Sequence, residues 1–269
     1  MITHSATLDV PEETATLVTE LLVAERLRCG TLSGSRAASA RTQAILVLRW
    51  FREDAGMKVL AADAGVSLAT GYRYLHEGID VLAASAPELP AVLAAGKADG
   101  WTHVTVDGTL IATDRCRTVN PDTGHDLWYS GKHRAHGGNV QVISDSTGFP
   151  VAVSDVEPGS VHDLTAARRT GFLGALHAAA SLLGLPALAD KGYDGAGAGI
   201  HTPTKGSGLH PDNATRNELI SCLRAEGERG IALLKTRWKA LRRIRLCPQR
   251  IGAIAKAALV LTTAERPIR

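Results

Sequence analysis

Residues 104–111 form a short apolar, β-branched run with an aspartate at its centre, and this feature most narrows what the chain can fold into. The apolar residues predict a buried strand. Asp107 is a carboxylate that the core of a sheet would not leave unpaired. Gly108 beside it allows another backbone, a ligand or a phosphate to approach closely. Asp107 therefore either ends a strand and binds a turn, or belongs to a functional site.

A second run of the same kind, residues 185–193, carries Asp190 with Gly192 close behind. Parallel strands that end in carboxylates at one sheet edge make a site for hard cations, which prefer oxygen ligands. A long helix predicted over about 213–243 offers a third carboxylate, at Glu226 or Glu228. Three such groups could hold two divalent ions ~3.5–4 Å apart, the arrangement that promotes phosphoryl transfer.

The faces of this helix distinguish its two glutamates. Glu226 lies on a flank that also carries Leu219, Cys222 and Leu233, whereas the flank of Glu228 carries Arg224, Lys235 and Arg242. Because these basic groups could hold DNA phosphates beside a metal ligand, we choose Glu228. Residues 216–250 contain ten Lys and Arg against three Glu, an excess of seven positive charges. A solvated helix face is the usual explanation for such a run, but the imbalance favours a polyanionic partner.

The N-terminal third of the chain is predicted to be helical, with helices over 11–29 and 42–54. Residues 57–75 are typical of a helix-turn-helix: a short helix ends at Gly65 and Ser67 caps a second helix. The second helix would present Thr70, Arg73 and Tyr74 to a DNA groove. An ordinary helical hairpin is the alternative interpretation.

Residues 86–99 contain two prolines and an alanine-rich run, which predicts a linker. We therefore expect an N-terminal helical region over 1–90, with the helix-turn-helix at about 41–85, and a second domain over 91–269.

The second domain contains a polar stretch, 113–138, in which the basic cluster Lys132, His133 and Arg134 is either a solvated loop or a set of phosphate contacts. Residues 140–153 predict a β-hairpin that turns at 146–148. Asp163 is expected to cap a helix running to about 169, with a place near the metals as the alternative. His162 is either a surface residue or a neighbour of the site. This order of elements predicts an α/β fold, a mixed sheet flanked by helices.

Bulk composition adds limits. The 269 residues are 45% apolar and carry a formal charge of +3, which by itself is too small to indicate nucleic acid. The four cysteines show no metal-binding spacing and are expected to be reduced thiols. Residues 1–10 do not resemble a signal peptide, and the apolar run 251–262 is too short to cross a bilayer. We expect a cytoplasmic protein with no membrane partner.

Five segments together resemble the DDE transposases of the bacterial insertion-sequence family five and Harbinger-like group. They are Asp107 within Val-Asp-Gly-Thr, Tyr-Ser-Gly-Lys-His at 129–133, Pro-Gly-Ser-Val-His-Asp at 158–163, Ala-Asp-Lys-Gly-Tyr at 189–193, and Glu228 followed by Leu234-Lys235. The resemblance covers about residues 101–264, and a preceding helix-turn-helix belongs to the same architecture. The separations of 83 residues from Asp107 to Asp190 and 38 from Asp190 to Glu228 suit the family. Gly227 departs from it, because a β-branched aliphatic residue usually precedes the catalytic glutamate.

The resemblance implies an RNase H-like fold preceded by an all-α helix-turn-helix domain. It also implies two Mg²⁺ ions, replaceable by Mn²⁺, with Asp107, Asp190 and Glu228 as ligands. The implied activity is cleavage at terminal inverted repeats followed by joining of the 3′-hydroxyl to target DNA. The expected partners are double-stranded DNA and a second protomer, since transposition brings two ends together. The expected location is the bacterial cytoplasm, at the nucleoid.

Three other functions compete with this one. A non-catalytic DNA-binding protein, such as a regulator or a domesticated transposase, would need only the helix-turn-helix. Another RNase H-like nuclease would cut DNA without joining it. A small-molecule phosphohydrolase would use the carboxylates and leave the basic helix unexplained.

Overall fold

The computed structural model describes residues 7–114, 116–121 and 124–266. Five helices come first: α1 (Glu12–Arg28), α2 (Ala40–Glu53), α3 (Met57–Asp63), α4 (Leu68–Ala84) and α5 (Leu89–Ala98). Next come β1 (Val104–Thr113), β2 (Tyr129–Ser130), β3 (Ala135–Ser144), β4 (Pro150–Val153), β5 (Glu157–Pro158), α6 (Asp163–Arg169), α7 (Phe172–Leu183), β6 (Ala187–Leu188), the 3₁₀ turn η1 (Lys191–Tyr193) and β7 (Ile200–His201). The last elements are α8 (Pro211–Arg237), η2 (Lys239–Arg242), β8 (Arg243–Ile244), η3 (Pro248–Arg250) and α9 (Ile251–Ala264).

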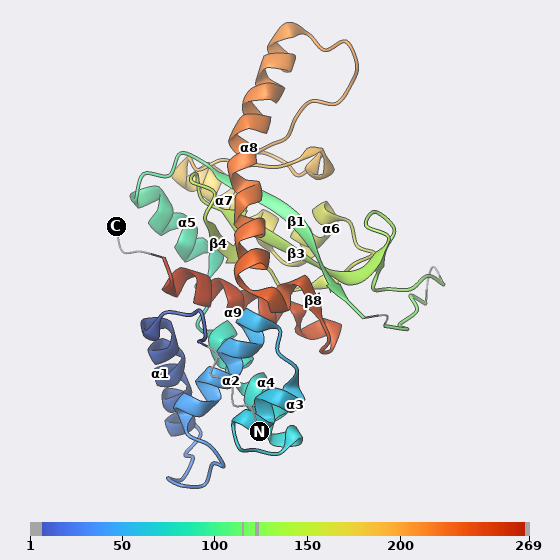
Figure 1. The fold of residues 1–269 in the computed structure, drawn as a ribbon. Coiled ribbons are helices and arrows are strands. Elements are labelled where there is room, and N and C mark those ends of the chain that lie inside the picture. The colour runs from blue at the N-terminus through green and yellow to red at the C-terminus, as the bar shows by residue number, and fades with distance from the viewer. Residues whose placement is uncertain (1–6, 115, 122–123, 267–269) are drawn as a thin grey trace.

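The strands form one mixed sheet in the order β2-β3-β1-β6-β7, with β4 and β5 also pairing with β3. The long strands β1 and β3 are antiparallel. β1 runs parallel to β6 and to β8, and β6 runs parallel to β7. The predicted α/β class is therefore confirmed, as a largely antiparallel sheet with helices on its faces (Figure 1).

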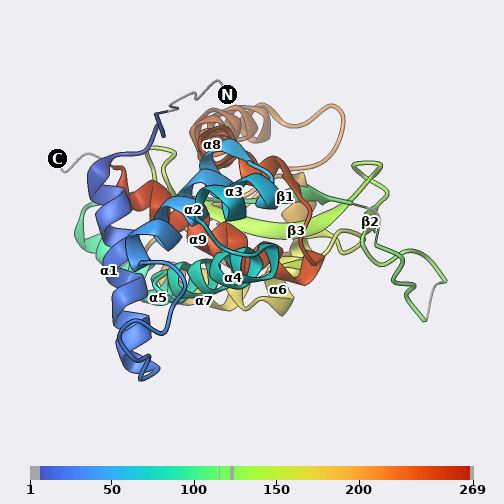
Figure 2. The same ribbon diagram turned by 60° about the horizontal axis from the view of Figure 1, so that its bottom comes forward.

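Helices cover both faces of the sheet, and each face has its own core. Val104 and Val106 of β1 point into a cluster with α5, α6 and α7. Ile111, odd-numbered and so on the opposite face, joins a cluster with α8 and α9. This second cluster also takes in the apolar side chains of α1 to α4, so α9 packs between the N-terminal helices and the sheet (Figure 2). The division into two domains near residue 90 stays a prediction.

The predicted linker over 86–99 is wrong, because most of it is α5. Pro90 lies in the first turn of α5, where proline's fixed φ favours helix formation. Leu89 and Leu93 are buried, and Gly96 packs on the ring of Trp101. The alanine run is helix packed on α7, and its few bulky residues are sufficient to anchor it.

The turn between α3 and α4 lies where it was predicted, but α3 ends at Asp63 and α4 continues to Ala84, beyond the predicted segment 57–75. Gly65 adopts a left-handed φ of 66° and Ser67 accepts a hydrogen bond from the Thr70 backbone. A Cβ on Gly71 would lie 2.9 Å from the Ala61 Cβ, so this glycine allows the two helices to cross closely. Whether the pair forms a DNA-binding helix-turn-helix stays a prediction.

One residue of the predicted DNA-binding face is wrongly placed. Tyr74 is only 3% exposed, and its hydroxyl accepts a hydrogen bond from the Ala38 backbone. It belongs to the core, and Tyr72 and Arg73 are exposed instead. Thr70 is partly buried and accepts a hydrogen bond from Arg73 Nη2 at 2.9 Å.

Helix α8 is shorter than predicted, ending at Arg237 instead of about 243. Trp238 takes an extended conformation and is fully buried, which turns the chain into η2. The apolar residues of α8 are buried only in part: Ile220 and Leu234 are buried, whereas Leu223 is 44% exposed. The N-terminal half of α8 extends beyond the sheet (Figure 1). Among the described residues no single helix is long and apolar enough to cross a membrane, and α4 with α5 would reach that length only as a pair bent by 48°.

Candidate active site

The structure brings Asp107 and Asp190 together from neighbouring parallel segments. Thr105 of β1 pairs with Leu188 of β6, and each aspartate lies two residues beyond this pair. Asp107 lies within β1, which continues to Thr113, and not at a strand end. Asp190 follows β6 and caps η1, where its carboxylate accepts a hydrogen bond from the Gly192 backbone at 2.8 Å.

Asp107 is electrostatically strained in this position. Burial raises its pKa to about 6, the positive charge of Arg224 acts in the opposite direction, and the nearby charges of Asp190 and Asp163 raise it further. The Gly108 backbone N–H donates to the carboxylate and partly offsets the rise. Carboxylates gathered in a partly desolvated place favour the arrival of a positive charge.

Helix α8 crosses the sheet over Asp107. Gly227 packs on Thr105, because a Cβ there would stand 2.7 Å from the Thr105 Cβ. Arg224 and Lys235 both interact electrostatically with Asp107. Glu228 is four residues after Arg224 and seven before Lys235, so it shares their face of the helix.

Glu226 is directed away from this face. Its carboxylate is paired with Arg229, and its backbone packs against Gly148 in the β3–β4 turn. The side chain of Glu228 is exposed. Within the described residues, no three His, Cys, Asp or Glu side chains are grouped as a metal site. The structure thus assembles Asp107 and Asp190 and leaves Glu228 apart, on the helix face directed toward them.

Lys235 and Arg242 do not form the predicted row of phosphate-binding groups with Arg224. The Lys235 ammonium donates to Thr109 Oγ1 at 2.7 Å and to the Leu110 carbonyl at 3.0 Å, and burial lowers its pKa. Lys235 therefore fastens α8 to β1. Arg242 lies in η2, beyond the helix, and donates to the Lys235 carbonyl at 3.3 Å.

About half of the basic residues in the run 216–250 form ion pairs with acidic residues. Arg229 pairs with Glu226, Arg237 with Asp9 and Glu265, Arg243 with Asp114, Arg245 with Asp54, and Arg250 with Asp80. Within the part of the chain that the structure describes, five of the ten basic residues are thus in ion pairs, four of them with acids outside the run. The local excess of seven charges overstates the positive charge that is free to bind phosphate.

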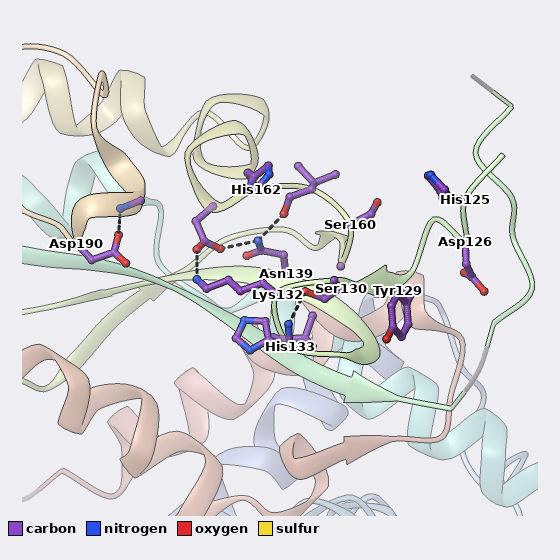
Figure 3. Close-up of a pocket in the computed structure, with 16 residues that line it drawn as sticks. His125, Asp126, Tyr129, Ser130, Lys132, His133, Asn139, Ser160, His162 and Asp190 are labelled. Carbon is purple, nitrogen blue, oxygen red and sulfur yellow. Dashed lines mark hydrogen bonds and ion pairs between the residues drawn. The ribbon is translucent and has the colours of Figure 1, made fainter. Parts of the chain in front are cut away.

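A polar cleft of about 690 Å³ lies beside the carboxylates, with Asp190 and Asp163 among its lining residues (Figure 3). Lys132 and His133 line it from the loop before β3, and phosphate contact by them stays a prediction. Arg134 is exposed, has a left-handed φ of 51° and is not among the lining residues. His162 is exposed and also lines the cleft, so both interpretations of this residue, a surface residue and a neighbour of the site, agree with the structure.

Asp163 is not a capping residue, so that prediction is wrong. His162 occupies the cap position of α6, and Asp163 is the first helical residue. Its carboxylate accepts hydrogen bonds from Asn139 Nδ2 at 2.7 Å and Lys132 Nζ at 2.9 Å. The bond to Asp163 raises the pKa of Lys132, and the charges of Asp190 and Asp107 add to this rise. One ammonium group is therefore in the field of all three aspartates.

Three buried polar residues behind the site were not predicted: Asn139, Gln141 and Tyr193. The Tyr193 hydroxyl donates to Gln141 Oε1, and Gln141 Nε2 donates to Asn139 Oδ1 at 2.9 Å. Asn139 in turn donates to Asp163. The sequence did carry a signal, because two amides alternate with valines in a strand that is buried on both faces.

The donor set fits a hard divalent cation. Asp107 and Asp190 offer carboxylate oxygens. The charge of Asp190 raises the pKa of Asp107, and a bound cation would lower that pKa again. A third carboxylate would come from Glu228 on the facing side of α8. No soft ligand is needed at such a site.

A family model described as DDE superfamily endonuclease matches residues 106–263, more than half of the chain. No curated protein matches. The solved structures that it resembles include a Mos1 transposase paired-end complex with the left transposon end, at 12% identity over 87% of this chain and 98% of that chain, with a TM-score of 0.22. A Mos1 strand transfer complex matches at 14% identity over 81% and 83%, with a TM-score of 0.23. Similarity at this level carries no argument about this chain.

Proposed function

Because this chain belongs to the DDE superfamily of endonucleases, we propose that it is a transposase that cuts DNA at the terminal inverted repeats of its element and joins the freed 3′ ends to target DNA. The observation that carries the proposal is the placement of Asp107 and Asp190 on adjacent parallel segments beneath α8. An RNase H-like catalytic fold and a DNA-binding helix-turn-helix formed by α3 and α4 are part of the same proposal.

Two Mg²⁺ ions, replaceable by Mn²⁺, would be held by Asp107, Asp190 and Glu228, and when bound they would activate the attacking hydroxyl and stabilise the leaving 3′ oxygen. Asp107 and Asp190 would be metal ligands because they lie on neighbouring parallel segments of the sheet. The Glu228 side chain would have to turn toward the two aspartates. The contact between Gly227 and Thr105 holds the Glu228 backbone near the strand that carries Asp107.

The basic side chains around the site would position DNA through its phosphates without reading bases. Lys132 and His133 would do so within the cleft, together with Arg134, the next residue of the same loop, and Arg224 of α8, whose charge acts on Asp107. Thr70 and Arg73 on α4 would contact a DNA groove. The partners proposed are double-stranded DNA ends, target DNA and a second protomer, at the nucleoid of a bacterial cytoplasm.

One observation favours a second candidate, a DNA-binding protein that has lost cleavage. Within the described residues the three carboxylates are not grouped as a metal site. A domesticated transposase that binds its ends without cutting them would need no such grouping. The two candidates predict opposite results in one assay.

That assay is cleavage of a labelled duplex that carries the inverted repeats flanking the gene, with Mg²⁺ or Mn²⁺, by the wild-type chain and by Asp190→Asn. Cutting at the repeat boundary that requires both the metal and Asp190 would support the transposase. Joining of the cut ends to a second DNA would separate a transposase from another nuclease of this superfamily. Tight, sequence-selective binding by both proteins without cutting would support the DNA-binding remnant and overturn the enzyme.

A further inference from the structure

A continuous chain of hydrogen bonds runs behind the candidate active site, from the turn that carries Asp190 to the side chain of Lys132. It begins at Tyr193, the last residue of η1, whose cap is Asp190. It passes through Gln141 and Asn139 on β3 and reaches Asp163 on α6. Lys132 donates to the second oxygen of Asp163 at 2.9 Å. These hydrogen bonds therefore join two rims of the cleft that are far apart in sequence. Figure 3 shows the end of the network at Asn139 and Lys132.

Tyr193, Gln141 and Asn139 are buried, so their polar groups must form these hydrogen bonds within the protein. Tyr193 and Gln141 are fully buried, and Asn139 is 6% exposed. Each hydrogen bond has an unambiguous direction: the phenol and the two amide groups can donate only toward Asp163 if every bond is to be made. Asn139 also donates to the Val161 carbonyl at 2.9 Å, which holds the segment before α6. Buried networks that are fully satisfied in this way are rigid.

Gly108 shows how tightly Asp163 is held against the strand that carries Asp107. A Cβ on Gly108 would overlap the Asp163 carboxylate and stand 3.0 Å from the Asp163 Cβ. Asp163 thus lies on the backbone of the residue next to Asp107. Its Oδ1 is occupied by Asn139, and its Oδ2 holds the ammonium of a side chain that is otherwise 59% exposed.

We propose that Asp163 is a positioning residue that holds the Lys132 ammonium at the edge of the active site, and that Asn139, Gln141 and Tyr193 hold Asp163 in turn. A lysine on an exposed loop would otherwise sample many rotamers, and fixing one of them in advance lowers the cost of binding a phosphate in a single geometry. The inference rests on the proposed function, since it concerns where the scissile phosphate lies.

The test is a double-mutant cycle between Asp163→Asn and Lys132→Ala, read as single-turnover cleavage of the inverted-repeat duplex at saturating DNA. Asn keeps an acceptor for Asn139 but loses the charge that holds Lys132. We expect each single variant to lower the cleavage rate on the order of 10²-fold, because small misplacement of a reacting group has effects of this size. The double variant should be no slower than the slower single variant.

Two further measurements separate positioning from folding and from general charge. Affinity for the same duplex in Ca²⁺ should change by less than about threefold for Asp163→Asn, so that the loss lies in the rate and not in binding. Lys191→Ala is the matched control: this exposed lysine follows Asp190 in η1, and the hydrogen bonds of the Asp163 carboxylate are to Asn139 and Lys132 instead. Its effect should multiply with that of Asp163→Asn, because the two residues act independently.

Tyr193→Phe tests the end of the hydrogen-bond network opposite Lys132, should Asp163→Asn fold poorly. It removes only the hydroxyl that donates to Gln141 and keeps the buried ring. We expect a smaller loss of rate that disappears when Lys132 is already Ala. Multiplying effects in the cycles with Lys132 would overturn the inference while leaving the nuclease intact. A wild-type chain that cuts no DNA with metal would overturn the proposed function, and the inference with it.

Discussion

Gly227 of α8 lies directly on Thr105 of β1, so that a Cβ at the helix position would overlap the threonine hydroxyl and stand 2.7 Å from its Cβ. The contact is two residues before Asp107 on the strand and one residue before Glu228 on the helix. It therefore sets how closely the two carboxylate-bearing elements approach. It also explains why this chain has glycine where the family it resembles usually has a β-branched residue.

Gly227→Ala is expected to destabilise the fold, although alanine favours helix. The gain in helix propensity is about 1 kcal/mol, whereas forcing a methyl group into a packed contact typically costs about 1–3 kcal/mol. Urea unfolding measures the difference. Gly174→Ala in α7 is the matched control, since nothing lies within 4 Å of its Cβ, and it should be neutral or stabilising. Stabilisation by both substitutions would contradict a close contact between α8 and β1.

Asp107→Asn is expected to stabilise the metal-free protein above about pH 6 while abolishing cleavage. Burial raises the pKa of Asp107 from 3.8 to about 6 in the folded state, so folding favours the protonated form. Stability from this group is present below about pH 4 and is lost as the pH rises through the folded pKa. The loss is on the order of 2–3 kcal/mol, and an asparagine avoids it.

The measurement is urea unfolding of both proteins at pH 4 and pH 7.5 in EDTA. The two curves should be close at pH 4, where Asp107 is neutral in the folded protein, and the variant should be the more stable at pH 7.5. Mg²⁺ should then stabilise the wild type more than the variant, because a ligand that binds only the folded state raises stability. Equal stability at both pH values would show that the Asp107 carboxylate is not strained.

Glu228→Gln is expected to abolish cleavage, whereas Glu226→Gln should leave most of it. Glu228 shares a helix face with Arg224 and Lys235, which act on Asp107, and Glu226 is paired with Arg229. A lost metal ligand removes several kcal/mol of transition-state stabilisation, a rate loss on the order of 10³-fold. Single-turnover cleavage rates of the two variants measure this difference. A larger loss of rate for Glu226→Gln than for Glu228→Gln would identify Glu226 as the third metal ligand.

Arg73→Ala and Tyr74→Phe are expected to change different properties, DNA affinity for the first and stability for the second, because α4 exposes Arg73 and buries Tyr74. Arg73→Ala should weaken DNA binding across sequences and reduce the salt dependence by about one ion. Tyr74→Phe removes the acceptor for the Ala38 backbone and should cost about 1 kcal/mol of stability with unchanged affinity. Fluorescence anisotropy at several salt concentrations measures the first effect and urea unfolding the second. Unchanged binding by Arg73→Ala would argue against DNA contact by α4.

Much of the fold was predictable where the signal is local. The segments with Asp107 and Asp190 are apolar runs with a following glycine, and α3, α4 and the β3–β4 hairpin have turn residues at the required positions. Helix α5 was not predicted because Pro87, Pro90 and the alanine run are also typical of a linker. Its packing on α7 shows that the segment is part of the fold. Helix α8 was predicted too long because its apolar spacing continues to Leu241, although Trp238 leaves the helix to enter the core.

The sequence by itself determined which residues carry chemistry: two aspartates on apolar strands, a helix with glutamates, a basic loop and the family to which these belong. Only the tertiary structure decided what each side chain does. It buried Tyr74, bound Lys235 to β1, paired four of the basic residues near the C-terminus with acids from other segments, and turned Asp163 from a helix cap into the partner of Lys132. The physical reason is range. Strand and turn propensities act over a few residues, whereas these ion pairs and buried hydrogen bonds join segments that only the packed fold brings into contact.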